Sequence, residues 1–205
     1  MGRNEQEIQV AVFDVGNVIF RFTNGLRWLS GLLGAPEDIV RQSWLSVDDR
    51  ACRGEMEMQE VWAHLAREHN YTGPEIDFLK GWAKNFEPII QTHQLLADLL
   101  PVVAVGLLTN VYPGGMTAAI EAGAVPNLDY KFVVESCKVK SVKPEVKIFA
   151  AAEAAAGVKP TSLLLVDDLV SNVIVAQQRN WQGLVFMPGQ ADKSVARIRK
   201  MLAVS

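Results

Sequence analysis

Short runs of apolar residues recur along this chain, and each run ends in polar or turn-forming residues. The runs are continuous rather than alternating, which is typical of strands buried on both faces of a parallel sheet. Between most of them, apolar residues recur every three or four positions, which is the spacing of a helix. This alternation predicts an α/β fold with a doubly wound parallel sheet. The expected strands span residues 8–13, 102–108, 131–135, 162–166 and 183–186.

Helices are expected between these strands, and their ends carry recognisable signals. Pro144 followed by Glu145 is typical of a helix start, and Gly157 is typical of a helix end. Asn180 stands where a residue in the left-handed conformation would close another helix. The expected helices span residues 88–100, 144–156 and 171–179.

The alternation is interrupted between residues 20 and 87, where no convincing strand occurs. We expect a helical insertion over 20–87 and an α/β core made of residues 1–19 and 88–205. Four of the five tryptophans lie in the insertion, either packing its helices together or facing a pocket. Its expected helices span residues 25–33, 36–45, 55–70 and 74–84.

Composition and charge narrow the class of protein. A net charge of −3 over 205 residues gives no reason to expect a nucleic-acid or membrane partner. No apolar run approaches the roughly 20 residues of a membrane helix, and the polar start at residues 1–7 is unlike a signal peptide. Cys52 and Cys137 form no metal-type pair, so free thiols and a cytoplasmic location are expected.

Polar residues that can take part in catalysis or ligand binding follow three of the expected strands. Asp14 follows the first strand, Thr109 and Asn110 follow the second, and Asp167 and Asp168 follow the strand at 162–166. One such residue alone could simply cap a helix. Because the carboxyl ends of parallel strands meet at one edge of the sheet, we expect the three groups to converge where ligands bind.

Lys143 adds a positive charge to this set. It is one of four lysines between residues 137 and 147, and it differs from the others because Pro144 restricts the chain beside it. Taken in chain order, these residues form four short motifs. The motifs are Phe13-Asp14-Val15-Gly16-Asn17-Val18, Leu108-Thr109-Asn110, Lys143-Pro144-Glu145, and Val166-Asp167-Asp168 with Asn172.

The four motifs, in this order across residues 10–180, resemble those of the haloacid dehalogenase superfamily. Within it, the chain is most similar to the group of α-D-glucose-1-phosphate phosphatases and N-terminal phosphatase domains of soluble epoxide hydrolases. The resemblance implies a Rossmann-like core with a helical cap at 20–87. It also implies a phosphatase for a small phosphorylated metabolite, with sugar phosphates among the candidate substrates.

The resemblance implies a role for each motif residue. Asp14 would be the nucleophile that forms an aspartyl-phosphate. Mg²⁺ would be held by Asp14, the Gly16 carbonyl and Asp168, with Asp167 as a neighbouring or alternative ligand.

The remaining motif residues would handle the phosphoryl group. Lys143 would neutralise its oxygens and balance Asp14. Thr109 and Asn110 would position those oxygens, and Asn172 would orient Lys143 or the acidic pair.

Gly16 departs from most phosphatases of the superfamily, which carry there an aspartate that protonates the leaving oxygen and activates water. The lost proton transfer is typically worth about 10²–10⁴-fold in rate. The chain could prefer good leaving groups such as anomeric sugar phosphates, replace the acid by water or an insertion residue, or bind phosphorylated ligands with weak or no activity. The insertion residues considered, all expected in loops, are Asp48, Asp49, Arg50 and Glu55.

Other enzymes of the superfamily remain as alternatives. A 2-haloacid dehalogenase also lacks the second aspartate and needs no metal, but Asp167 beside Asp168 argues against it because paired acids are costly without a cation. A phosphonatase would need an insertion lysine, and only Lys80 and Lys84 occur there. A mutase relies on the missing aspartate. The oligomeric state stays open between monomer and homodimer.

Overall fold

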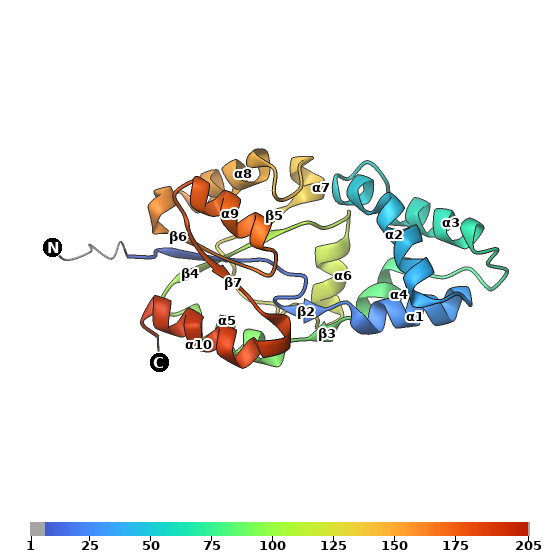
Figure 1. Ribbon diagram of the computed structural model, residues 1–205, viewed down its shortest axis with the longest axis horizontal. Helices are drawn as coiled ribbons and strands as arrows, with labels where there is room; N and C mark the ends of the chain where they lie inside the picture. Colours follow the sequence, from blue (N-terminus) through green and yellow to red (C-terminus); the bar gives the residue numbers. More distant parts are fainter. Residues whose placement is uncertain (1–6, 205) are drawn as a thin grey trace.

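The computed structural model describes residues 7–204 and has a five-stranded parallel sheet at its centre (Figure 1). The strand order is β5-β4-β1-β6-β7, so the first strand lies in the middle and the order reverses around it. The expected doubly wound α/β fold is confirmed. The strands are β1 (Val10–Phe13), β4 (Ala104–Thr109), β5 (Phe132–Glu135), β6 (Leu163–Asp167) and β7 (Gln182–Val185).

Helices cover both faces of this sheet (Figure 1). One face packs against α8 (Val146–Ala156) and α9 (Val170–Gln178), and the other packs against α5 (Ile90–Leu99) and α10 (Ala191–Leu202). The shorter elements are α6 (Gly115–Glu121), α7 (Ser136–Val139) and the 3-10 turns η1 (Pro160–Ser162) and η2 (Pro188–Gln190).

The central strand shows why its apolar run is continuous. Val10 and Val12 pack with the residues of α8 and α9, whereas Ala11 and Phe13 pack with those of α5 and α10. Successive side chains of a strand point to opposite faces, so a sheet covered on both sides needs apolar residues at every position.

Several helix ends differ from the expectation. α8 begins at Val146, with Glu145 as its cap residue, rather than at 144. Asn180 has a φ of 65°, as the expected left-handed residue does. The sequence did not predict α6 and α7, because helices of seven and four residues are too short to leave a periodic pattern.

The stretch between β1 and α5 is a helical insertion, as expected. It also contains two short strands, β2 (Phe20–Arg21) and β3 (Glu87–Pro88), so the expectation of no strand there is corrected. They pair antiparallel where the chain enters and leaves the insertion, and two residues each leave no readable pattern. The helices of the insertion are α1 (Thr23–Leu33), α2 (Glu37–Cys52), α3 (Met58–Glu68) and α4 (Phe78–Lys84).

α2 is longer than the expected 36–45 and ends at Cys52. Val47 and Ala51 continue its buried face, and the Trp44 indole N–H donates to Asp48 Oδ1 at 3.0 Å one turn later. Asp48, Asp49 and Arg50 therefore lie on a helix and not in a loop.

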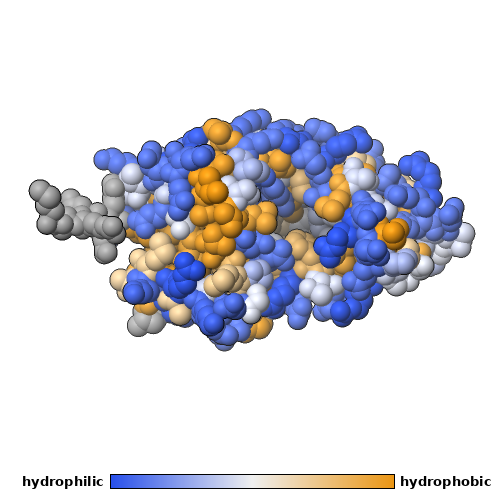
Figure 2. All heavy atoms as spheres, viewed as in Figure 1, coloured by the Kyte–Doolittle hydropathy of each residue, from blue (hydrophilic) through white to orange (hydrophobic). Residues whose placement is uncertain are grey.

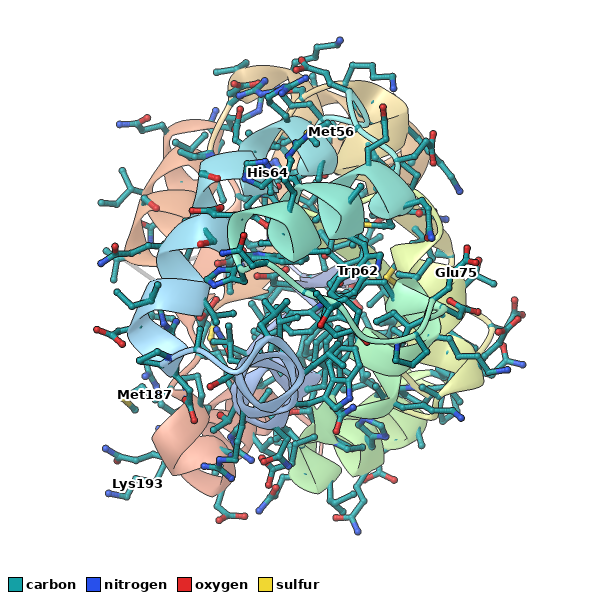
Figure 3. All side chains as sticks on the ribbon, turned by 90° about the vertical axis from the view of Figure 1, so that its right-hand side faces the viewer. Met56, Trp62, His64, Glu75, Met187 and Lys193 are labelled. Atoms are coloured by element: carbon teal, nitrogen blue, oxygen red, sulfur yellow. The ribbon has the colours of Figure 1, made fainter. Side chains whose placement is uncertain are left out.

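Aromatic residues pack the insertion together and join it to the core. Phe78 is fully buried, and its ring lies against those of Trp62 at 5.3 Å and Trp44 at 6.1 Å between centroids. Figure 3 looks onto the insertion, with Trp62 in its interior and Glu75 at its edge. The same hydrophobic cluster continues through Trp82 into the core.

Three further expectations concern the chain as a whole. Cys52 and Cys137 are buried free thiols, as expected. Within residues 7–204, no helix is long and apolar enough to cross a membrane. The polar start, apart from Glu7, lies outside the described residues.

Because one hydrophobic cluster spans the insertion and the core, we expect a single cooperative unfolding transition. Phe78→Ala should lower the free energy of unfolding by about 3–5 kcal/mol, since it leaves a cavity among packed rings. Ile39→Ala, on the exposed face of α2, should change it by less than about 0.5 kcal/mol. Urea unfolding followed by circular dichroism and tryptophan fluorescence checks both, and two separate transitions would contradict the expectation.

Candidate active site

Acidic residues from two neighbouring strands meet at the carboxyl edge of the sheet. Asp14 follows β1, Asp167 is the last residue of β6, and Asp168 comes next. One carboxylate oxygen from each lies within 4.8 Å of the other two. The convergence arises because β1 and β6 pair in parallel and end together.

Lys143 reaches this cluster from the segment before α8. Its Nζ lies 2.7 Å from Asp14 Oδ1 and 2.7 Å from Asp167 Oδ2, and its side chain is only 1% exposed. Asp14 Oδ1 also accepts a hydrogen bond from the Val15 N–H at 2.6 Å. Among the described residues, Asp14 Oδ2 has no partner, so this oxygen is free to react.

Asp167 has a partner on both of its oxygens. Besides Lys143 on Oδ2, its Oδ1 accepts from the Leu169 N–H and from Asn172 Nδ2, both at 2.9 Å. Asn172 therefore holds Asp167, the acid that also accepts from Lys143. Asp168, in contrast, accepts from the side chain of Asn17 at 3.1 Å.

The cluster is short of positive charge. Burial raises the pKa of Asp14 to about 7; Lys143 opposes this rise and the carboxylate of Asp167 adds to it. Burial also raises the pKa of Asp168. Burial alone would lower the pKa of Lys143, but the carboxylates of Asp14 and Asp167 raise it above its usual value. Three acids thus share one ammonium group, and this favours protonation of the cluster until another cation balances it.

The donor set fits a hard divalent cation. Carboxylate oxygens are the ligands that Mg²⁺ prefers, and a double charge would offset the deficit of the cluster. Asp14 and Asp168 line the cavity together with Gly16, whereas both oxygens of Asp167 are already occupied. The first three residues are therefore better placed as ligands, and Asp167 is better placed to hold Lys143.

A cavity of about 310 Å³ opens above the cluster, between the core and the helical insertion. Figure 2 shows the surface hollowed there. Its floor carries Asp14 and Lys143, and its opposite wall is built from the insertion, with Trp44 and Trp82 among the lining residues. Two of the four insertion tryptophans therefore line the cavity and pack the helices at the same time, so both interpretations hold.

The Thr109-Asn110 motif at the end of β4 contacts the segment that carries Lys143. Asn110 lines the cavity, but its side chain bonds to the backbone of Lys143, accepting from its N–H at 2.7 Å and donating to its carbonyl at 3.1 Å. Thr109 is buried and lies outside the residues that line this cavity. In this structure Asn110 fixes the position of Lys143.

Phe22 explains why position 16 is a glycine. A Cβ built on Gly16 would lie 2.7 Å from Phe22 Cε2. The Phe22 ring is held in turn by Phe20, Phe86 and Trp82, with ring centroids 5.0, 5.2 and 6.4 Å away. Any side chain at position 16 therefore requires this aromatic group to move.

One face of α2 supplies cavity residues, and apart from Trp44 and Asp48 they were not singled out from the sequence as site residues. Arg41, Leu45, Asp48 and Cys52 line the cavity with Trp44. Their spacing of three or four residues is a helical stripe, a signal present in the sequence but hidden because the helix was expected to end at 45. Tyr112, which follows β4, lines the cavity as well and carried no such signal.

The end of α2 is fastened to the core beside Lys143. Arg53 forms a bidentate ion pair with Glu145, from Nη2 to Oε1 at 2.6 Å and from Nη1 to Oε2 at 3.2 Å. These hydrogen bonds lower the pKa of Glu145 to about 2. The Ser136 hydroxyl donates to the Cys52 carbonyl at 2.6 Å. These contacts tie the cavity wall to the segment that carries the lysine.

Solved structures of similar fold are enzymes of the haloacid dehalogenase (HAD) family. A HAD family enzyme from Bacteroides thetaiotaomicron superposes with a TM-score of 0.75 at 19% identity, covering 90% of this chain and 96% of that one. A HAD phosphatase from Thermococcus onnurineus gives 0.67 at 19%, covering 95% and 98%. L-2-haloacid dehalogenase from Xanthobacter autotrophicus also gives 0.67 at 19%, covering 97% and 84%.

These likenesses show that the chain has the HAD fold, with a Rossmann-like core. No family model matches the chain, and no curated protein matches it.

Lys143→Met should leave two buried carboxylates without their partner. In the presence of a chelator we expect the free energy of unfolding to fall by about 3–5 kcal/mol, as for other broken buried ion pairs. Lys147→Met removes an exposed lysine on α8 and should change it by less than about 0.5 kcal/mol. Chemical denaturation at pH 7.5 compares the two, and equal losses would show that Lys143 does not balance the cluster.

Proposed function

We propose that this protein is a Mg²⁺-dependent phosphatase for a small phosphorylated metabolite, with the helical insertion acting as a cap over the site. The observation that carries the proposal is the Asp14–Lys143–Asp167–Asp168 cluster at the floor of the cavity, with Asp14 Oδ2 unpartnered. An aspartate with one oxygen anchored and the other free is arranged as a nucleophile.

In the first step Asp14 Oδ2 attacks phosphorus and the ester oxygen leaves, so the phosphoryl group is transferred to the aspartate. Water then hydrolyses the aspartyl-phosphate and returns the free carboxylate. The Lys143 ammonium and the Val15 N–H hold Asp14 Oδ1, which fixes the direction of attack. Mg²⁺ would be held by Asp14, Asp168 and the Gly16 carbonyl, and would offset the negative charge shared by the nucleophile and the phosphoryl group.

Lys143 also neutralises the phosphoryl oxygens, and its place depends on residues around it. Asn110 holds its backbone and Asp167 holds its ammonium group, while Asn172 holds Asp167. Thr109 does not line the cavity and donates to the Asn110 carbonyl at 3.4 Å, so we assign it to the support of Asn110 and not, as expected, to the phosphoryl oxygens. Catalysis of this kind relies mainly on positioning and electrostatics.

The similar structures support this proposal. A structure of the Bacteroides enzyme holds magnesium and inorganic phosphate, and it matches this chain with a TM-score of 0.73 at 19% identity. The Xanthobacter dehalogenase, with chloropropionic acid covalently bound, keeps dehalogenation as the second candidate. The acidic cluster favours the phosphatase, because three acids with one lysine call for a further cation.

Asp14→Asn should abolish turnover. With p-nitrophenyl phosphate and Mg²⁺, we expect a loss of at least about 1000-fold, since the variant lacks the nucleophile. A chelator should silence the wild type as well. Release of chloride from 2-chloropropionate that persists in the chelator would instead favour the dehalogenase, and residual phosphatase activity within tenfold of wild type would exclude Asp14 as the nucleophile.

Mg²⁺ binding should depend on pH through the pKa of Asp14, which is raised to about 7 in the metal-free protein. Below that pH a proton competes with the cation, so affinity should rise with pH by up to about tenfold per unit and level off above 7. Isothermal titration calorimetry in buffers of different ionisation enthalpy measures both the affinity and the released proton. Affinity that does not change between pH 5.5 and 7 would contradict this, and Asp14→Asn serves as the control that lacks the titrating group.

A further inference from the structure

The proposed phosphatase still lacks a group that protonates the leaving oxygen. Residue 16 cannot supply one, because it is a glycine and Phe22 occupies the space where its side chain would lie. The group must therefore come from elsewhere in the cavity. This inference rests on the proposed function and asks which side chain performs that step.

Three carboxyl groups line the cavity, and two of them belong to the cluster at its floor. Asp14 is the nucleophile, and Asp168 is held by Asn17 beside it. The third is Asp48, on the opposite wall, which is formed by α2. A substrate whose phosphoryl group rests on the floor extends its leaving group toward that wall.

The contacts of Asp48 leave one of its oxygens available. Oδ1 accepts from the Trp44 indole N–H at 3.0 Å and lies 3.9 Å from Cys52 Sγ. Among the described residues, Oδ2 has no hydrogen-bond partner. The carboxyl is thus fixed in orientation by one oxygen and can exchange a proton with a ligand through the other.

The other polar side chains of the cavity are poor proton donors. Burial raises the pKa of the Tyr112 hydroxyl and that of the Cys52 thiol well above their usual values. Lys143 is held by two carboxylates, and a guanidinium such as that of Arg41 does not release its proton in proteins. Burial also raises the pKa of Asp48, but here the rise keeps the acid protonated closer to neutral pH.

We propose that Asp48 is the catalytic acid and base that stands in for the absent side chain at position 16. As the bond between phosphorus and the leaving oxygen breaks, the Asp48 carboxylic acid gives its proton to that oxygen, and the phosphoryl group passes to Asp14. The Asp48 carboxylate then accepts a proton from the water that attacks the aspartyl-phosphate. The cycle ends with the alcohol, inorganic phosphate and Asp48 again in its acid form.

Asp48→Asn tests this role with two substrates that differ in their need for a proton. In kcat/KM, which reports only the transfer of the phosphoryl group to Asp14, alkyl phosphates with strongly basic alkoxide leaving groups should fall at least about 100-fold, whereas p-nitrophenyl phosphate should change by less than about threefold. The kcat for both esters should fall, because Asp48 also activates the water of the second step. Asn retains an oxygen that can accept from Trp44, and circular dichroism verifies the fold. An equal effect on kcat/KM for both esters would overturn the proposal.

Two further measurements support or overturn the assignment. Asp48→Glu should recover part of the alkyl phosphatase activity, and Asp38→Asn, at the exposed start of α2, should leave both activities unchanged. The wild-type rate for alkyl esters should fall at alkaline pH, with a limb that Asp48→Asn removes. The other titratable groups near Asp48 are Asp49, Cys52 and Tyr112, and a limb that persists in the variant would overturn the assignment to Asp48.

The wild type alone distinguishes this inference from the proposed function. Absence of Mg²⁺-dependent hydrolysis of either ester would refute the phosphatase itself. Hydrolysis of p-nitrophenyl phosphate together with alkyl esters more than about 1000-fold slower would retain the phosphatase and refute a general acid, because an enzyme with one depends weakly on the leaving group.

Discussion

The site depends on one ammonium group held between two buried carboxylates. Lys143 Nζ lies 2.7 Å from both Asp14 and Asp167 and is almost fully shielded from water. Charges of this kind are costly to bury, so each partner needs the others in place. Asn172 holds Asp167, Asn110 holds the backbone of Lys143, and Lys143 in turn fixes the orientation of Asp14.

The sequence predicts the core well because its signals are local. The apolar run ending at Asp14 and the run ending at Asp167 mark neighbouring strands, and parallel pairing alone then brings their acids together. The insertion was harder to predict. α2 continues through Asp48 because Val47 and Ala51 are buried and Trp44 donates to Asp48, contacts that depend on helices packed in three dimensions. Similarly, the contact of Asn110 with Lys143 spans 33 residues and leaves no pattern in the sequence.

Core and insertion contribute different chemistry to one cavity. The sheet edge supplies closely spaced charges at the ends of strands, while α2 supplies a stripe of charged and apolar side chains on the opposite wall. The ion pair of Arg53 with Glu145 ties the two surfaces together two residues from Lys143. The segment that carries the ammonium group therefore also contacts the end of α2.

The packing of Phe22 against Gly16 also couples the two positions. An acidic side chain at position 16 requires the ring to shift, since its Cβ would lie 2.7 Å from the ring edge. The ring stands among Phe20, Phe86 and Trp82, so removing it opens a cavity in the packing that joins the insertion to the core. Substitutions at positions 16 and 22 should therefore have effects on stability that are not additive.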